Sequence, residues 1–149
     1  SGFAALLLAT SPAAAAPEVG KAAPEFSLKN SKGADVKLSD FKGKTVVLEW
    51  HNPECPFVKK HYDSGNMQKL QGVVKDMQVV WLTINSSAAG KQGNMDGAKA
   101  DAYIASSKSA QSYYLLDADG TVGKLYEAKT TPHMFVINPE GNIAYMGAI

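Results

Sequence analysis

The chain is organised around Asn52-Pro53-Glu54-Cys55-Pro56-Phe57-Val58-Lys59-Lys60-His61-Tyr62, a stretch that contains the only cysteine in 149 residues. The run at residues 45–50, Thr-Val-Val-Leu-Glu-Trp, leads directly into it and has the composition of a buried strand. Pro56 suits the first position of a helix, because its fixed φ is helical and it has no N–H to satisfy. The sequence therefore places Cys55 at a junction between a buried strand and a helix.

Two interpretations of Cys55 follow. At the start of a helix, the positive end of the helix dipole favours the thiolate, which is the reactive form of the side chain. A free cysteine can equally be a small apolar residue that fills the core. Because an edge between strand, loop and helix is not a core position, we favour the reactive interpretation.

The run at residues 43–50, followed by Cys55-Pro56-Phe57-Val58-Lys59, resembles the redoxin branch of the thioredoxin superfamily, which includes the alkyl hydroperoxide reductase and thiol-specific antioxidant (AhpC/TSA) relatives. The resemblance extends from Pro24 to the end of the chain. It implies a thioredoxin-like α/β fold, with a mixed central sheet flanked by helices and an N-terminal β-hairpin.

Residue patterns agree with that fold. Apolar residues alternate with polar ones on both sides of a turn at residues 31–33, as in an edge hairpin. Strand and helix patterns then alternate along the chain, which predicts an α/β sandwich. We expect later strands at residues 78–85, 113–116, 130–137 and 143–146, and helices from residue 56 with a break at 64–66, at 98–107 and at 122–128. The polar, glycine-rich residues 86–97 suit a mobile lid or, as we favour, a solvated connection.

Composition excludes several classes of function. The formal net charge is +1 with no basic block, so nucleic-acid binding is not expected. All 15 cationic residues are lysines, so the chain lacks the rigid bidentate fork that only arginine offers. A single cysteine excludes an internal disulfide and any zinc site that needs two cysteines. No cofactor is predicted.

The two ends of the chain suggest processing. Residues 2–9 are apolar but too short to span a bilayer, and four alanines at 13–16 suit a cleavage zone. We predict that residues 1–16 are the remnant of a signal peptide and that residues 17–149 form a redoxin domain, periplasmic or secreted, without a stable membrane span after cleavage. A disordered or tag-derived leader is the alternative. Because thioredoxin-like folds normally close with a helix, we also expect a truncation at Ile149 that leaves apolar sheet surface uncovered.

Thr131-Pro132 precedes a predicted strand and resembles the cis-proline step of the superfamily. The resemblance implies that Pro132 is cis, that its loop lies against Cys55, and that the Thr131 backbone pairs with a bound substrate chain. An ordinary turn that enters a strand is the alternative.

The chain departs from two patterns of the superfamily. Dithiol relatives carry a second cysteine three residues before the reactive one, where this chain has Asn52. Peroxiredoxins carry proline seven residues before it, threonine or serine three before it, and a distant arginine; this chain has Leu48, Asn52 and no arginine. Asn52 is left as a hydrogen-bond donor to the sulfur. We therefore expect slow cleavage of peroxides, which needs donors for the developing oxygen charge.

Charged neighbours act on Cys55 in opposite directions. Glu54 should raise the pKa of the thiol, whereas the helix N-terminus and Lys59, one turn further on, should lower it. Lys59 can equally be a solvated surface lysine. The three histidines (His51, His61 and His133) match no standard metal-site spacing with Cys55, so no metal is predicted.

Two functions remain. In the first, an exported thiol oxidoreductase uses Cys55 to attack a disulfide or a small peroxide, and an external thiol resolves the product. Its partners would be a thiol reductant or a disulfide-bearing protein, and its site would comprise Cys55 with Asn52, Glu54, Pro56, Lys59, Thr131 and Pro132. In the second, the chain is a non-catalytic thioredoxin-like module that binds a partner protein or a metal.

Overall fold

The structure, a computed structural model, describes residues 15–149, so nearly all of the predicted signal peptide lies outside the described residues. The elements are, in chain order, β1 (Ser27–Asn30), β2 (Asp35–Lys37), the 3₁₀ turn η1 (Leu38–Phe41), β3 (Val46–Trp50), α1 (Pro56–Asp63), α2 (Asn66–Asp76), β4 (Val80–Asn85), α3 (Gly97–Ser107), β5 (Tyr113–Leu116), α4 (Thr121–Leu125), β6 (His133–Ile137) and β7 (Ile143–Gly147).

The seven strands form one mixed sheet in the order β2-β1-β5-β4-β3-β6-β7. The three central strands β5, β4 and β3 are parallel, and helices connect them: α1 and α2 lie between β3 and β4, and α3 lies between β4 and β5. Strands β6 and β7 on one side, and β1 and β2 on the other, are antiparallel to their neighbours. The predicted mixed sheet and N-terminal hairpin are both confirmed, as is the break between α1 and α2.

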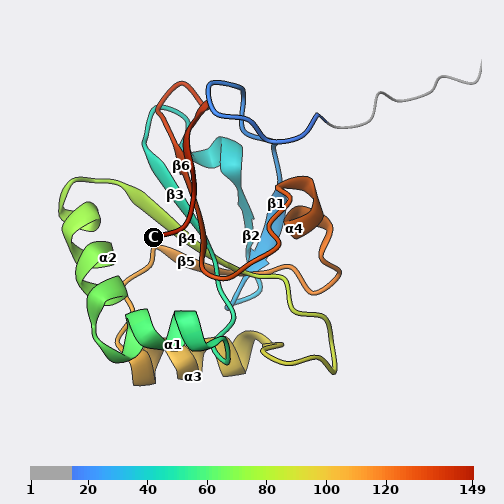
Figure 1. The fold of residues 1–149 in the computed structure, drawn as a ribbon, viewed down its shortest axis with the longest axis vertical. Helices are drawn as coiled ribbons and strands as arrows, with labels where there is room; N and C mark the ends of the chain where they lie inside the picture. Colours follow the sequence, from blue (N-terminus) through green and yellow to red (C-terminus); the bar gives the residue numbers. More distant parts are fainter. Residues whose placement is uncertain (1–14) are drawn as a thin grey trace, which may run out of the picture.

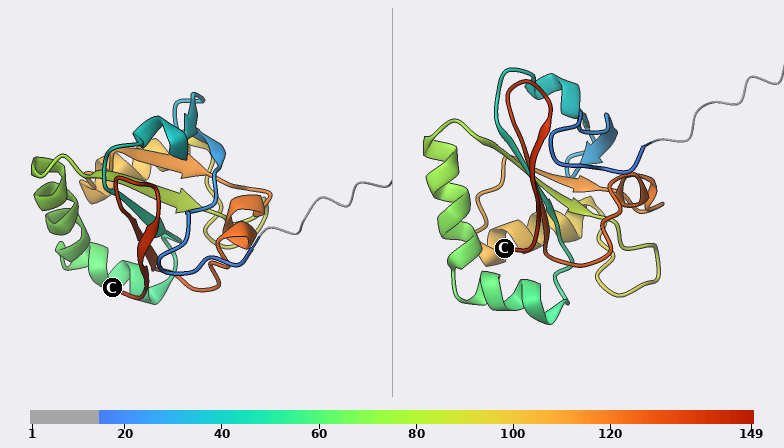
Figure 2. Two further views of the ribbon diagram at one scale, coloured as in Figure 1. Left: turned by 90° about the horizontal axis from the view of Figure 1, so that it is seen from above. Right: turned by 45° about the horizontal axis from the view of Figure 1, so that its top comes forward.

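Alternation along β3 divides the core into two layers (Figure 1, Figure 2). Val46, Leu48 and Trp50 point to the face that is covered by α4 and the N-terminal segment. Val47 points to the opposite face, where α1, α2 and α3 pack. Because successive side chains of a strand alternate between faces, Glu49 must also point to this second layer, in the middle of the apolar core.

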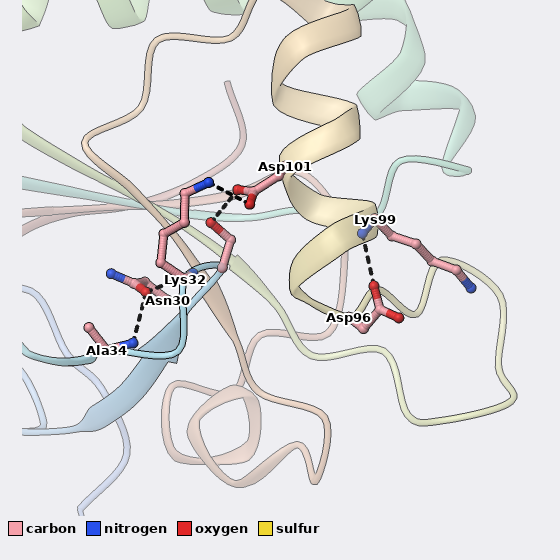
Figure 3. Close-up of polar contacts among 7 residues, drawn as sticks. Asn30, Lys32, Ala34, Asp96, Lys99 and Asp101 are labelled. Atoms are coloured by element: carbon pink, nitrogen blue, oxygen red, sulfur yellow. Dashed lines mark hydrogen bonds and ion pairs between the residues drawn. The ribbon is translucent and has the colours of Figure 1, made fainter.

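The N-terminal hairpin is fastened to α3 at its turn (Figure 3). The hydroxyl of Ser31 donates to Asp101 at 2.6 Å, and the Lys32 ammonium lies 2.7 Å from the other oxygen of the same carboxylate. A Cβ at Gly97 would lie 2.3 Å from the Ser31 carbonyl oxygen, so the close approach of hairpin and helix requires glycine at this position. These contacts hold the α3 layer against the edge of the sheet.

Apolar side chains remain exposed on β7 and along α2. Tyr145 and Met146 on the edge strand β7 are 45% and 39% exposed, and Leu70 and Val73 of α2 are exposed together with Met77 at its C-cap. The expected truncation at Ile149 itself stays a prediction. Among the described residues, no helix has both the length and the apolar content that a bilayer crossing requires.

Candidate active site

Cys55 occupies the N-cap of α1, as the sequence predicted, with extended backbone angles and Pro56 as the first helical residue. The chain reaches this position from β3 through a tight turn. In that turn the Cys55 N–H donates to the Asn52 carbonyl oxygen at 3.1 Å, and the Glu54 N–H donates to the Asn52 side-chain oxygen at 2.9 Å. Such bonds between an asparagine and the backbone two residues on stabilise turns.

The loop before β6 meets the sulfur, although it is 76 residues away along the chain. The Cys55 thiol donates to the Thr131 carbonyl oxygen at 3.3 Å. The Thr131–Pro132 peptide bond is cis. The predictions of a cis Pro132 and of a Thr131 backbone in contact with Cys55 are therefore confirmed.

Opposing influences set the ionisation of Cys55. Burial of the sulfur raises the pKa, whereas hydrogen bonding by the Thr131 side chain and by the backbone N–H groups of Val58 and Phe57 lowers it, and the balance lies below the ordinary thiol value of 9.0. The bond that the protonated thiol donates to the Thr131 carbonyl favours the thiol, so the donors that face the sulfur decide the direction. The two N–H groups belong to the first turn of α1, where no intrahelical partner exists. The site therefore favours a nucleophilic thiolate.

Lys59 is not among the groups that lower the pKa of Cys55. Its side chain is exposed and lies at a different hollow, which Asp63, Gln68, Tyr103 and residues of the α3 C-terminus also border. Its role as a cationic partner stays a prediction.

A shallow hollow adjoins the sulfur. It has a volume of about 220 Å³ and is lined by Phe57, His61, residues 130–132 and the C-terminal residues 148–149. Phe57 is 69% exposed, although aromatic side chains usually pack inside. Since Thr131 both lines the hollow and contacts Cys55, a molecule bound there would lie next to the thiol.

Beneath α1, the structure explains Glu49, for which the sequence offered no role. Its carboxylate is fully buried and accepts hydrogen bonds from Tyr62 at 2.7 and 2.8 Å, from the Trp81 indole at 2.9 Å and from Thr83 at 3.1 Å. Burial raises the pKa of Glu49 to about 7, against the lowering effect of hydrogen bonding by Tyr62, Trp81, Thr83 and Gln71. The same burial, together with the nearby carboxylate, raises the pKa of Tyr62 and keeps its hydroxyl protonated.

His51 is buried next to this cluster. Its Nδ1 lies 2.7 Å from the Tyr114 hydroxyl and its Nε2 lies 3.1 Å from the Tyr103 hydroxyl. Burial lowers the pKa of His51 to about 3, so the ring is neutral. Both ring nitrogens are occupied by hydrogen bonds. Within residues 15–149, no group of three or more His, Cys, Asp or Glu side chains is placed to hold a metal ion.

Asn52 and Glu54 act differently from the sequence-based expectation. The Asn52 side-chain oxygen bonds to Glu54 N–H, and no hydrogen bond from Asn52 to the sulfur occurs in the described part of the chain. The Glu54 carboxylate accepts a hydrogen bond from the backbone N–H of Gly93 at 2.7 Å. The loop at residues 86–97 is therefore pinned to the reactive turn, and the expectation of a merely solvated connection was wrong at Gly93, which is buried.

Sequence reasoning missed three contributors to the site: Gly93, Glu49 and the role of Val58. Gly93 lies 38 residues after Cys55, in a loop that carries no recognisable sequence motif. Glu49 was detectable in the sequence, because a carboxylate inside an apolar strand must find hydrogen-bond partners or change its pKa. Val58 follows Cys55 by one helical turn, and its backbone N–H bonds to the sulfur, a contact that its apolar side chain gives no sign of in the sequence.

A cysteine at the N-terminus of the helix that follows a central parallel strand, with a cis-proline loop against its sulfur, defines a thioredoxin-like protein of the redoxin type. Residues 19–146 match the AhpC/TSA family, and the chain belongs to that family.

Two curated proteins are similar to the chain in sequence. Over 124 residues the chain is 27% identical to the thiol-disulfide oxidoreductase ResA of Bacillus subtilis (strain 168), covering 83% of this chain and 64% of ResA. It is 29% identical to the thioredoxin-like protein YneN of the same organism, covering 83% of this chain and 68% of YneN. The chain thus spans about two thirds of the length of these relatives.

Solved structures share the fold. A conserved uncharacterized protein from Geobacillus kaustophilus superposes with a TM-score of 0.79 at 26% identity, over 88% of this chain and 69% of that one. The thioredoxin domain of a thiol-disulfide oxidoreductase from Bacteroides vulgatus gives a TM-score of 0.68 at 22% identity, over 88% of this chain and 89% of that domain.

Proposed function

We propose that this protein is a thiol-disulfide oxidoreductase in which Cys55 is the nucleophile and an external thiol completes the reaction. The observation that carries the proposal is the surroundings of the sulfur: the first N–H groups of α1 and the Thr131 side chain together hold the pKa of Cys55 below that of an ordinary thiol. The name of the relative ResA supports the same chemistry.

The reaction proceeds by two exchanges. The Cys55 thiolate attacks one sulfur of a substrate disulfide, so a new S–S bond forms, the substrate S–S bond breaks, and the leaving thiolate takes up a proton. A second, external thiolate then attacks the substrate sulfur of the mixed disulfide, which restores the Cys55 thiolate and releases the substrate fragment as a disulfide with the external thiol. We assign the second thiol to an external molecule because Asn52 stands where dithiol relatives carry their second cysteine, and these 149 residues hold no cysteine besides Cys55.

Disulfides are favoured over peroxides as substrates. Cleavage of a peroxide leaves negative charge on the departing oxygen, which must be stabilised by positioned donors. This chain has no arginine and carries Leu48 in place of the proline found in peroxiredoxins. A sulfur leaving group needs less of this help, because a thiolate is more stable than hydroxide.

A protein segment is the substrate that fits the hollow beside Cys55. Phe57 and Pro132 offer apolar surface, and the Thr131 backbone lies against the sulfur. An extended chain can pair with such a backbone as an added strand. We further propose that the protein acts outside the cytoplasm, on the grounds of the apolar and alanine-rich residues 2–16.

The test compares wild type with Cys55→Ser in the presence of oxidised glutathione. The wild-type protein should gain the mass of one glutathione and lose it again on addition of an external thiol, whereas the serine variant should do neither. A Cys55→Ser variant that kept full biological activity would show that the protein is a non-catalytic binding module instead.

A further inference from the structure

We propose that Glu54 and Gly93 form a latch that positions Cys55 for disulfide exchange, with Glu54 as a positioning residue and Gly93 as its partner. This inference rests on the proposed function of Cys55, but the latch itself can be tested by a separate structural measurement. The latch joins the turn at residues 52–55 to the loop between β4 and α3.

Both backbone polar groups of Gly93 form hydrogen bonds to side chains. Its N–H donates to the Glu54 carboxylate at 2.7 Å, and its carbonyl oxygen accepts from the Asn85 side-chain amide at 2.7 Å. A hydrogen bond to a charged group is stronger than one between neutral groups. Asn85 is itself buried at the end of β4, so the loop is tied to the core as well as to the reactive turn.

The fit between loop and turn leaves no room for a side chain at Gly93. A Cβ there would lie 2.1 Å from the Asn52 side-chain oxygen, and the residue has φ +81°, which favours glycine. The same Asn52 oxygen accepts from the Glu54 N–H at 2.9 Å. Gly93 therefore covers the hydrogen bond that shapes the turn, while Glu54 fastens Gly93 in place.

Two further contacts connect the latch to the buried His51. The Asn85 amide lies 3.3 Å from the Tyr114 hydroxyl, which lies 2.7 Å from His51 Nδ1. His51 directly precedes Asn52, and its own N–H donates to the Ile84 carbonyl oxygen at 2.8 Å. The turn before Cys55 is thus fixed at its start by His51 and at its outer side by the Gly93 peptide groups.

The position of Cys55 matters because its sulfur must face the N–H groups of α1 and the substrate disulfide at the same time. The N–H groups of Phe57 and Val58 lower the pKa of Cys55 only while the sulfur stays at the N-cap, and attack on a disulfide requires a defined approach. If the turn moved, Cys55 would lose the hydrogen bonds that lower its pKa and the geometry that attack on a disulfide requires. Glu54 therefore acts on Cys55 through the position of the turn, since its carboxylate is not among the groups that shift the pKa of Cys55.

Two pairs of variants separate positioning from charge. Glu54→Gln and Glu54→Ala both remove the negative charge, but only the glutamine can still accept a hydrogen bond from Gly93. The readout is the pH profile of exchange with oxidised glutathione. We expect the profile of Glu54→Ala alone to move to higher pH, because the N–H groups of Phe57 and Val58 no longer face the sulfur, and the limiting rate constant at high pH to fall on the order of tenfold in the same variant.

Gly93→Ala and Gly90→Ala form the second pair. Both glycines lie in the same loop with positive φ, at +81° and +75°, but a Cβ at Gly90 meets no atom within 4 Å. Gly93→Ala should lower the limiting rate constant, and Gly90→Ala should leave it unchanged.

Hydrogen exchange of the Gly93 amide tests the latch without reference to catalysis. Its protection should be lost in Glu54→Ala and kept in Glu54→Gln. If Glu54→Ala and Glu54→Gln gave equal limiting rates and equal protection, the latch would be refuted. If Cys55 did not react with disulfides at all while the protection pattern held, the proposed function would fail and the latch would stand as a structural feature.

Discussion

Replacing Glu49 by glutamine should change how the stability of the protein depends on pH. Glu49 titrates near pH 7 in the folded protein, because it is fully buried, and near its ordinary value of 4.5 when unfolded. Between these two values the folded state holds a proton that the unfolded state has released. The contribution of protonated Glu49 to the free energy of unfolding is therefore complete below pH 4.5 and is lost as the pH rises through about 7.

The magnitude follows from the two pKa values. Each pKa unit corresponds to about 1.4 kcal/mol, so the folded state loses about 3 kcal/mol relative to the unfolded state between the two limits. Glutamine keeps an oxygen that can accept from Tyr62, Trp81 and Thr83 but does not titrate. The free energy of unfolding of Glu49→Gln, minus that of wild type, should rise by about 3 kcal/mol from pH 4.5 to pH 8.

Because His51 also makes stability depend on pH, the quantity to measure is the difference in free energy of unfolding between Glu49→Gln and wild type. Burial lowers the pKa of His51 from 6.5 to about 3, so its contribution to stability is present above pH 6.5 and is lost as the pH falls toward 3. In wild type the two slopes have opposite signs and nearly cancel between pH 4.5 and 6.5. Glu49→Gln should therefore show a stability that rises with pH through this range, where the wild type is nearly flat.

Urea unfolding, followed by tryptophan fluorescence at several pH values, provides the assay. Glu140→Gln, at an exposed position in the turn before β7, controls for the loss of one carboxyl charge. A Glu49→Gln variant that kept a constant stability difference from wild type between pH 4.5 and 8 would show that Glu49 ionises normally in the folded state. The assignment of its raised pKa to burial would then be wrong.

Three further predictions concern the reactive site. Thr131→Ala should raise the pKa of Cys55, measured by thiolate absorbance, because a hydrogen bond to the sulfur is lost, whereas Lys59→Ala should leave it unchanged. Stopped-flow oxidation of the reduced protein by hydrogen peroxide should be slow by the standard of peroxiredoxins, and a rate matching theirs would contradict our reading of the site. Val58→Cys should close a disulfide with Cys55 on mild oxidation, seen as a loss of two hydrogens by mass spectrometry, because the two positions are separated by one turn of α1; two free thiols after oxidation would argue against it.

The sequence by itself determined the fold and the position of Cys55 at the start of a helix. Local signals were sufficient here: an apolar run before Cys55, a proline suited to the first helical position, and alternating patterns of period two and 3.6 along the rest of the chain. The same signals placed Cys55 at a helix N-terminus, where unpaired N–H groups favour the thiolate. The cis Pro132 and its contact with Cys55 were also foreseen, but only through the family resemblance, since no local rule predicts a cis bond.

Only the tertiary structure decided the roles of the groups around the sulfur. Asn52 was singled out three residues before Cys55 and Glu54 directly before it, but the carboxylate of Glu54 bonds to Gly93, which lies 39 residues further on and meets the turn only when the chain folds. Glu49 was visible as a charge in an apolar strand, yet its pKa depends on burial under α1 and on three side chains from other elements. Desolvation and hydrogen bonding are properties of the packed core, and a sequence pattern fixes which residues enter that core but not the distances at which they meet.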